Sequence, residues 1–268
     1  MTTDINHVSD YNQMRKTLFI INYALALDVI SRLHAGKKKQ TAIDLACGPG
    51  HFSMSLVNYL NFQRVFGLDL SQEMLETARA NAQNSCLSER VQFVKQDIRY
   101  LNCFEDQSVD LACFNHAAHH LHDLRDVRQV LTEMDQVTQK DGTVVLVDVA
   151  RFKTAELTDK YVKTFGADYL RQGLKSLYLD FESSMFAAWS VEELAQARPE
   201  KSQRNWFQLV PFGVPMLQMI IGLPSGEVPR LQATADSIQI EQLMIPKEFK
   251  TIWKLARWSL LSGQLNRL

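Results

Sequence analysis

Cysteine is scarce in this chain, and neither sign of charge predominates. The 268 residues include 4 cysteines and no CxxC pair, which excludes a disulfide-stapled scaffold and fits a reducing, cytoplasmic setting. The 29 Lys and Arg balance 30 Asp and Glu, for a formal net charge of −1. Nucleic-acid binders usually concentrate basic residues on one face. We therefore expect no nucleic-acid partner, and we interpret the basic run at 37–39 as a solvated loop.

Long hydrophobic runs are also missing. The stretch Leu18 to Ile30 contains Asn22 and Asp28 and is shorter than the roughly 20 apolar residues that span a bilayer. No cationic segment precedes an apolar one at the N-terminus, so no signal peptide is expected. We predict no membrane contact, and we interpret the stretch as an amphipathic helix in an N-terminal helical segment, residues 1–40.

Between residues 41 and 150, strand and helix signals alternate. Short apolar runs predict strands at 41–46, 64–68, 91–94, 109–114 and 143–149, with helices at 51–60, 71–83 and 127–137 between them. Strands this apolar are buried on both faces, and helical crossovers make them parallel. The pattern predicts an α/β fold, a Rossmann-like, doubly wound, mostly parallel sheet of seven strands.

The pattern changes after this core. Residues 151–205 are rich in helix formers and aromatics, which predicts an inserted helical cap over the sheet. Two late strands at 206–210 and 216–221, and a helix at 246–261 with Pro246 at its first position, complete the core within 206–268. Asp148 and Arg151 stand at the end of the fifth strand, where they could pair with each other.

The sharpest motif is DLACGPG, residues 44–50, between a predicted strand and a predicted helix. Gly48 and Gly50 allow a tight turn and a close backbone approach to a ligand. The amides at the start of the next helix point toward that ligand. Asp69 follows about 20 residues later, the usual place for a carboxylate that binds ribose hydroxyls.

Two cofactors could use this geometry. A dinucleotide site follows GxGxxG, but Ser53 occupies the third glycine position. The chain more closely resembles the class I S-adenosylmethionine (SAM)-dependent methyltransferases, in their small-molecule branch. The resemblance covers about residues 40–150 and consists of DLACGPG at 44–50, GLDLS at 67–71 with Met74-Leu75, KQDI at 95–98, and VDLACFN at 109–115 followed by HHL at 119–121. Ala46 departs from the pattern, since many members have glycine there.

The resemblance implies roles for individual residues. The loop from Ala46 to Gly50 lies against the methionine part of SAM, and Asp69 accepts from both ribose hydroxyls. Leu70 and Met74 flank the adenine, Asp97 accepts from its amino group near the Ile98 amide, and Asn115 lies close to the sulfonium. Arg15, with Tyr11 in a segment before the core, meets the SAM carboxylate or is a surface charge. The expected cofactor-binding set is Asp44, Ala46, Cys47, Gly48, Pro49, Gly50, Asp69, Leu70, Met74, Asp97, Ile98, Asn115 and Arg15.

A histidine cluster follows the fourth strand. His116, His119 and His120 have i, i+3, i+4 spacing, which would align them on one helical face, with His122 and Asp123 beyond. The cluster could shape the site structurally, supply a general base, or bind a metal. His119 and His120 are the catalytic candidates, and we name no metal ligand.

These features predict methyl transfer from SAM to an O, N or C nucleophile of a small-molecule acceptor, with S-adenosylhomocysteine as product. The protein would be a monomer or homodimer. Alternatives are a non-methylating enzyme on the same fold, a nicotinamide-dependent oxidoreductase, and a non-catalytic SAM-binding partner subunit.

Overall fold

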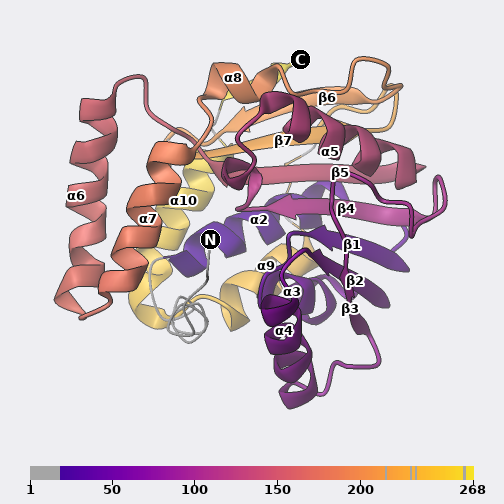
Figure 1. Ribbon diagram of the computed structural model, residues 1–268, viewed down its shortest axis with the longest axis horizontal. Helices are drawn as coiled ribbons and strands as arrows, with labels where there is room; N and C mark the ends of the chain where they lie inside the picture. Colours follow the sequence, from indigo (N-terminus) through magenta and orange to yellow (C-terminus); the bar gives the residue numbers. More distant parts are fainter. Residues whose placement is uncertain (1–18, 215, 230, 233, 262–263) are drawn as a thin grey trace.

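Helices cover both faces of one central sheet (Figure 1). The computed structural model describes residues 19–268 except 215, 230, 233 and 262–263. Its sheet has the strand order β3-β2-β1-β4-β5-β7-β6-β8. The α/β, mostly parallel doubly wound architecture predicted from the sequence is confirmed.

The first five strands pair in parallel, as the alternation of strands and helices predicts. β4 is buried at every residue because helices cover both of its faces, which explains its unbroken apolar sequence. Their bounds are β1 Thr41–Leu45, β2 Arg64–Asp69, β3 Val91–Lys95, β4 Val109–Asn115 and β5 Thr138–Val149.

The last three strands are antiparallel additions to one edge. β7 Leu217–Leu223 pairs with β5, β6 Asn205–Val210 pairs with β7, and β8 Gln264–Arg267 pairs with β6. The predicted count of seven strands was therefore one too low. β8 is short and largely polar, so it has no hydrophobic period from which a strand could be predicted.

The helices form two layers around the sheet. α2 Phe19–Leu33, α3 His51–Leu60, α4 Gln72–Asn84, α9 Ala235–Leu243 and α10 Lys250–Leu261 belong to one side. α5 Leu124–Val137 and the short α8 Val191–Ala195 cover the other. Two details differ from the sequence prediction: α9 was not foreseen, and the last helix starts at Lys250, after the 3₁₀ turn Lys247–Phe249.

An antiparallel pair, α6 Ala155–Arg171 and α7 Lys175–Ala187, stands at the left of the sheet in Figure 1. The two helices approach closely at Gly166, where a Cβ atom would lie 2.8 Å from the Tyr178 ring. α7 also contacts the 3₁₀ turn Ala118–His120 after β4. The helical cap thus reaches the carboxyl end of the parallel strands, while the division of the chain into four parts stays a prediction.

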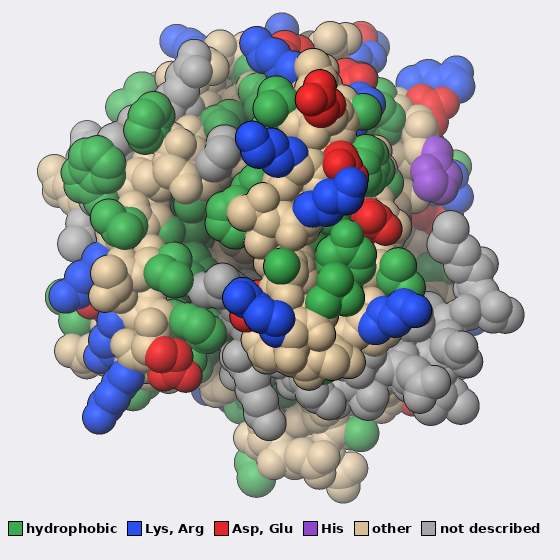
Figure 2. Space-filling model, turned by 90° about the vertical axis from the view of Figure 1, so that its left-hand side faces the viewer, with side chains coloured by type: hydrophobic (Ala, Val, Ile, Leu, Met, Phe, Trp, Pro, Cys, Tyr) green, Lys and Arg blue, Asp and Glu red, His purple; other side chains and the backbone are tan. Residues whose placement is uncertain are grey.

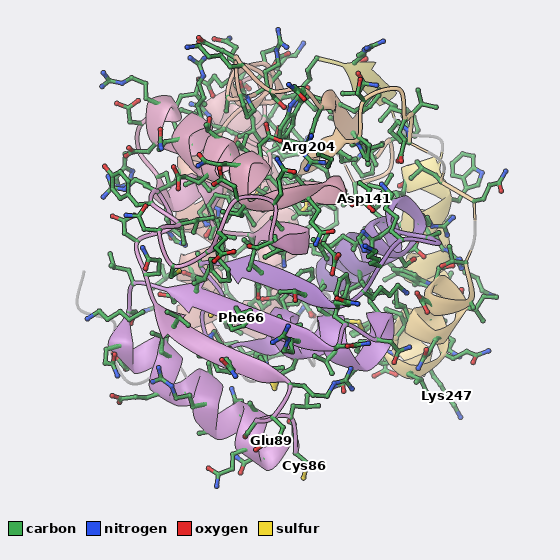
Figure 3. All side chains as sticks on the ribbon, turned by 90° about the vertical axis from the view of Figure 1, so that its right-hand side faces the viewer. Phe66, Cys86, Glu89, Asp141, Arg204 and Lys247 are labelled. Atoms are coloured by element: carbon green, nitrogen blue, oxygen red, sulfur yellow. The ribbon has the colours of Figure 1, made fainter. Side chains whose placement is uncertain are left out.

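A buried arginine secures the start of β5. Arg204 donates to the carbonyl oxygens of Thr138, Gln139 and Gly142, and it pairs with Asp135 at 2.7 Å. In Figure 3 it lies near the top of the sheet, above Asp141. These contacts hold the irregular 138–142 segment, which extends β5 five residues upstream of the predicted strand.

Candidate active site

A cavity of about 550 Å³ opens at the carboxyl ends of the parallel strands. Ligands of doubly wound sheets bind in this position. The loops after β1 to β4 line one part of the cavity, and α2 and the cap helices line another. The residues that line it include Asp44, Ala46, Cys47, Gly48, Pro49, Asp69, Leu70, Met74, Asp97, Ile98, Asn115, His119 and His120, all singled out in the sequence.

The loop after β1 turns through left-handed backbone. Ala46, Gly48 and Gly50 have φ of 51°, 52° and 79°. The Cys47 amide donates to the Leu68 carbonyl at 3.0 Å, which fixes the loop to β2. Gly50 does not line the cavity: a Cβ atom there would lie 2.5 Å from the Phe93 ring. Residue 50 must therefore be glycine both for the left-handed turn and because the Phe93 ring packs directly against it.

The Asp69 carboxylate is held in place by two backbone amides. Oδ2 accepts from Gly48 N and Oδ1 accepts from Ser71 N, each at 2.8 Å. Each carboxylate oxygen keeps a further lone-pair site. Asp69 can therefore accept two more hydrogen bonds from a ligand while it stays oriented toward the cavity.

Asp97 forms an ion pair with Arg99 that the sequence pattern did not predict. Arg99 donates to both Asp97 oxygens, with its Nη2 at 2.7 Å from Oδ2. These bonds hold the pKa of the Asp97 carboxyl below its ordinary value. Arg99 also lines the cavity, so a charged pair borders this end of it.

Asp44 and Asn115 lie deeper. Asp44 is buried and accepts from Ser53 Oγ at 2.6 Å. Burial raises the pKa of Asp44 to about 7 because the charged form loses its water. The Asn115 side chain is buried, and neither its Oδ1 nor its Nδ2 has a hydrogen-bond partner among the described residues. A buried amide without partners next to a cavity indicates a polar ligand.

A family model described as a methyltransferase domain matches residues 36–202, more than half of the chain. The chain belongs to the class I SAM-dependent methyltransferases. The chain is 26% identical over 182 residues to a 2-phytyl-1,4-naphtoquinone methyltransferase of Nostoc punctiforme, covering 65% of this chain and 76% of the relative. It is 26% identical to a demethylmenaquinone methyltransferase of Bacteroides fragilis, over 57% and 62% of the two chains.

The fold is shared with solved structures. A geranyl diphosphate methyltransferase in complex with SAM superposes with a TM-score of 0.55 at 14% identity, covering 83% of this chain and 91% of that one. SAM is the cofactor of the present methyltransferase. The cavity fits such a cofactor, since a left-handed loop, an oriented carboxylate and an unpartnered amide face one space. The assignment of particular residues to parts of SAM stays a prediction.

The histidines reach the cavity, but not on a helix as predicted. His116 adopts φ 53°, and only Ala118–His120 forms a single 3₁₀ turn. Left-handed backbone at His116 breaks the i, i+3, i+4 alignment. Among the residues that the structure describes, no three His, Cys, Asp or Glu side chains are grouped to hold a metal ion.

His119 pairs with Asp148, so the pairing of Asp148 with Arg151 that the sequence allows does not form. Asp148 Oδ1 lies 2.8 Å from His119 Nδ1, and Oδ2 accepts from the His119 amide at 2.7 Å. Burial opposes the charge on His119, but the Asp148 carboxylate outweighs it and raises the pKa of the imidazole. Arg151 pairs instead with Glu193 at 2.9 Å.

His120 lies beside this pair, with its ring centroid 4.2 Å from that of His119. Loss of water along the cavity wall lowers the pKa of His120, and the neighbouring His119 lowers it further. Desolvation lowers the pKa of His116 to about 4. His120 is therefore neutral near pH 7 and able to accept a proton.

Several lining residues were not singled out in the sequence. They come from α2, α3, the cap and the residue before β7, where an apolar or aromatic residue is usually part of a core, so no sequence signal distinguished them. Arg15 and Tyr11 lie outside the described residues. The additional lining residues include Tyr23, Phe52, Tyr169, Leu177, Asp180, Phe181, Ser184 and Met216.

Proposed function

We propose that this methyltransferase transfers the methyl group of SAM to an O, N or C nucleophile of a small-molecule acceptor held between the cap and the histidines. The observation that carries the proposal is the continuity of one cavity from Asp69 and Asp97 to His119, His120 and Phe181. SAM supplies the methyl group as a sulfonium. The chain's own residues position the acceptor and exclude water.

The acceptor end is lined mainly by apolar and aromatic side chains with a few polar groups. Tyr23 stacks on Phe52, with ring centroids 5.7 Å apart, and Tyr169 and Phe181 face in from the cap, 5.9 Å apart. Such surroundings suit a largely apolar molecule with one polar reactive group. The relatives named for a naphthoquinone and for demethylmenaquinone support a small-molecule acceptor of this kind.

We propose His120 as the general base. His119 contacts His120 and positions it, and Asp148 in turn orients His119. A neutral imidazole can take the proton of a phenol or enol as the methyl bond forms. The hydrogen bond between His119 Nδ1 and Asp148 fixes the orientation of the imidazole ring. The other ring nitrogen, Nε2, can then interact with groups in the cavity.

Methyl transfer is tested by incubating the full chain with methyl-labelled SAM and a panel of reduced quinones, phenols and amines, followed by mass spectrometry. A product heavier by one labelled methyl group, formed with S-adenosylhomocysteine, supports the proposal. Conversion of an acceptor without a gain of methyl would overturn it in favour of another reaction on this fold. SAM binding without turnover of any acceptor would support a partner subunit instead.

For the base, His120→Ala is expected to lower kcat by about 10²–10⁴-fold with little change in SAM affinity. Because the pKa of His120 lies below its ordinary value, wild-type kcat should stay constant near neutral pH and decline only under acid conditions. His122→Ala, an exposed histidine two residues away, is the matched control. Equal kcat for His120→Ala and wild type would remove His120 from the mechanism.

A further inference from the structure

An apolar stripe is exposed along α10. Ile252, Leu255 and Trp258 are three residues apart, so they share one side of the helix. They are 45%, 63% and 62% exposed. The opposite side, with Trp253, Ala256 and Leu260, is buried, and α10 packs against α2 there. A surface helix normally turns polar residues to water. α10 is apolar on both sides.

The neighbouring helix α9 also exposes apolar side chains. Arg257 of α10 pairs with Glu241 of α9 at 2.7 Å, which ties the two helices together. On α9, Ile238 and Leu243 are 51% and 66% exposed. Figure 2 shows this side of the molecule, with hydrophobic side chains at its left and Lys and Arg side chains below them.

Lysines border the stripe. At 100° per residue, Lys250 and Lys254 fall along one edge of the exposed side, next to Trp258. Lys247 is exposed in the 3₁₀ turn just before the helix. Among the described residues none of the three has an ion-pair partner. Lys247 projects outward from the rim of the molecule in Figure 3. The only acidic residue between 246 and 261 is Glu248.

The exposed apolar stripe and the lysines beside it indicate what kind of partner binds this surface. An apolar side with Trp, Leu and Ile, bordered by lysines, is the composition of a helix that lies in a membrane interface. A second copy that docks through the same face of α10 offers no acidic side chain of the helix to pair with these lysines. Anionic headgroups complement the lysines, whereas α10 of another copy leaves them without a counter-charge.

We propose that α10 docks this methyltransferase on the surface of an anionic lipid bilayer, with Ile252, Leu255 and Trp258 in the acyl boundary and Lys247, Lys250 and Lys254 on the headgroup phosphates. No helix in the described part of the chain is long and apolar enough to cross a membrane. Surface docking requires no such helix. The proposal departs from the sequence-based expectation of no membrane contact, because the sequence did not reveal which side of α10 stays exposed.

The test is co-sedimentation of the full chain with phosphatidylcholine vesicles that contain or lack phosphatidylglycerol. Binding is expected with the anionic vesicles and should decrease as salt rises. Leu255→Glu and the pair Lys250→Glu with Lys254→Glu should each weaken binding by about tenfold or more. Leu157→Glu, at a 51% exposed position on α6, is the matched control and should bind as wild type.

Two results would overturn the proposal. One is the absence of binding to anionic vesicles, or equal binding by Leu255→Glu and wild type. The other is a concentration-dependent dimer in analytical ultracentrifugation that Leu255→Glu abolishes, with no vesicle binding, which would assign the surface to a second copy. Calorimetry with S-adenosylhomocysteine shows that each variant is folded. Because vesicle binding is measured without an acceptor, it does not depend on the proposed function.

Discussion

Ala46 adopts a backbone conformation that residues with a Cβ atom rarely take, with φ of 51°. Left-handed backbone costs an L-residue about 1–2 kcal/mol, and glycine avoids this cost. We expect Ala46→Gly to raise the free energy of unfolding by about 1 kcal/mol, measured by urea denaturation.

The matched control is Ala42→Gly, a buried alanine of β1 in extended backbone, which should lower the free energy of unfolding by about 1 kcal/mol. If both glycine variants were equally destabilised, the loop at Ala46 would not be strained.

Asp69 provides the second prediction for a single residue. Its carboxylate is already oriented by the Gly48 and Ser71 amides, so a ligand meets it preorganised. Asp69→Ala should weaken S-adenosylhomocysteine binding by about 1–3 kcal/mol in calorimetry, the cost of a lost charged hydrogen-bond partner. Asp159→Ala, on the exposed side of α6, should bind normally. Unchanged affinity in folded Asp69→Ala would refute the ribose assignment.

Among the elements, β5 depends most clearly on one distant side chain. The Arg204 side chain is 6% exposed. It donates hydrogen bonds to three carbonyl oxygens of the 138–142 segment and forms an ion pair with Asp135. Arg204→Ala removes the buried donor that these acceptors and the carboxylate share. The free energy of unfolding should drop by about 3–5 kcal/mol, measured by urea denaturation.

Arg125→Ala is the control for this arginine, since its side chain is 88% exposed in the pair with Asp123. That variant should lose less than about 1 kcal/mol. Similar losses for the two variants would show that the start of β5 does not depend on Arg204.

Helices and strands with a clear hydrophobic period could be predicted from the sequence, and those without one could not. β4 and α5 have hydrophobic periods set by burial on two faces or one, and both were predicted to within a few residues. β8 has no such period, because its strand conformation comes from pairing with β6.

At the scale of the whole molecule, stability should respond to acid through buried histidines. His34 directly follows α2, its Nδ1 lies 3.1 Å from Thr143 Oγ1 of β5, and the residue is 1% exposed. Burial lowers the pKa of His34 from 6.5 to about 4. Between these values the unfolded chain binds the extra proton, so the contribution of His34 to the free energy of unfolding should decrease as pH falls from 6.5 to 4 and stay constant above 6.5. The raised pKa of Asp44 contributes in the opposite direction, so a comparison of wild type with a His34 variant isolates the histidine.

The decrease for one such histidine approaches about 3 kcal/mol. His34→Gln should therefore show a shallower loss of stability between pH 7 and pH 4.5, measured by urea denaturation at each pH. His116 still contributes in the same direction in that variant. A pH dependence identical to wild type would mean that His34 is not neutral in the folded protein.

The sequence by itself determined the parallel core, the glycine loop and Asp69, because these depend on periods and spacings that operate within about 25 residues. Only the tertiary structure decided the rest. His119 meets Asp148 across 29 positions, Phe181 enters the cavity from the cap, and α10 keeps an apolar side exposed. Periodicity shows that a helix has an apolar side, but which side is covered depends on what packs against it.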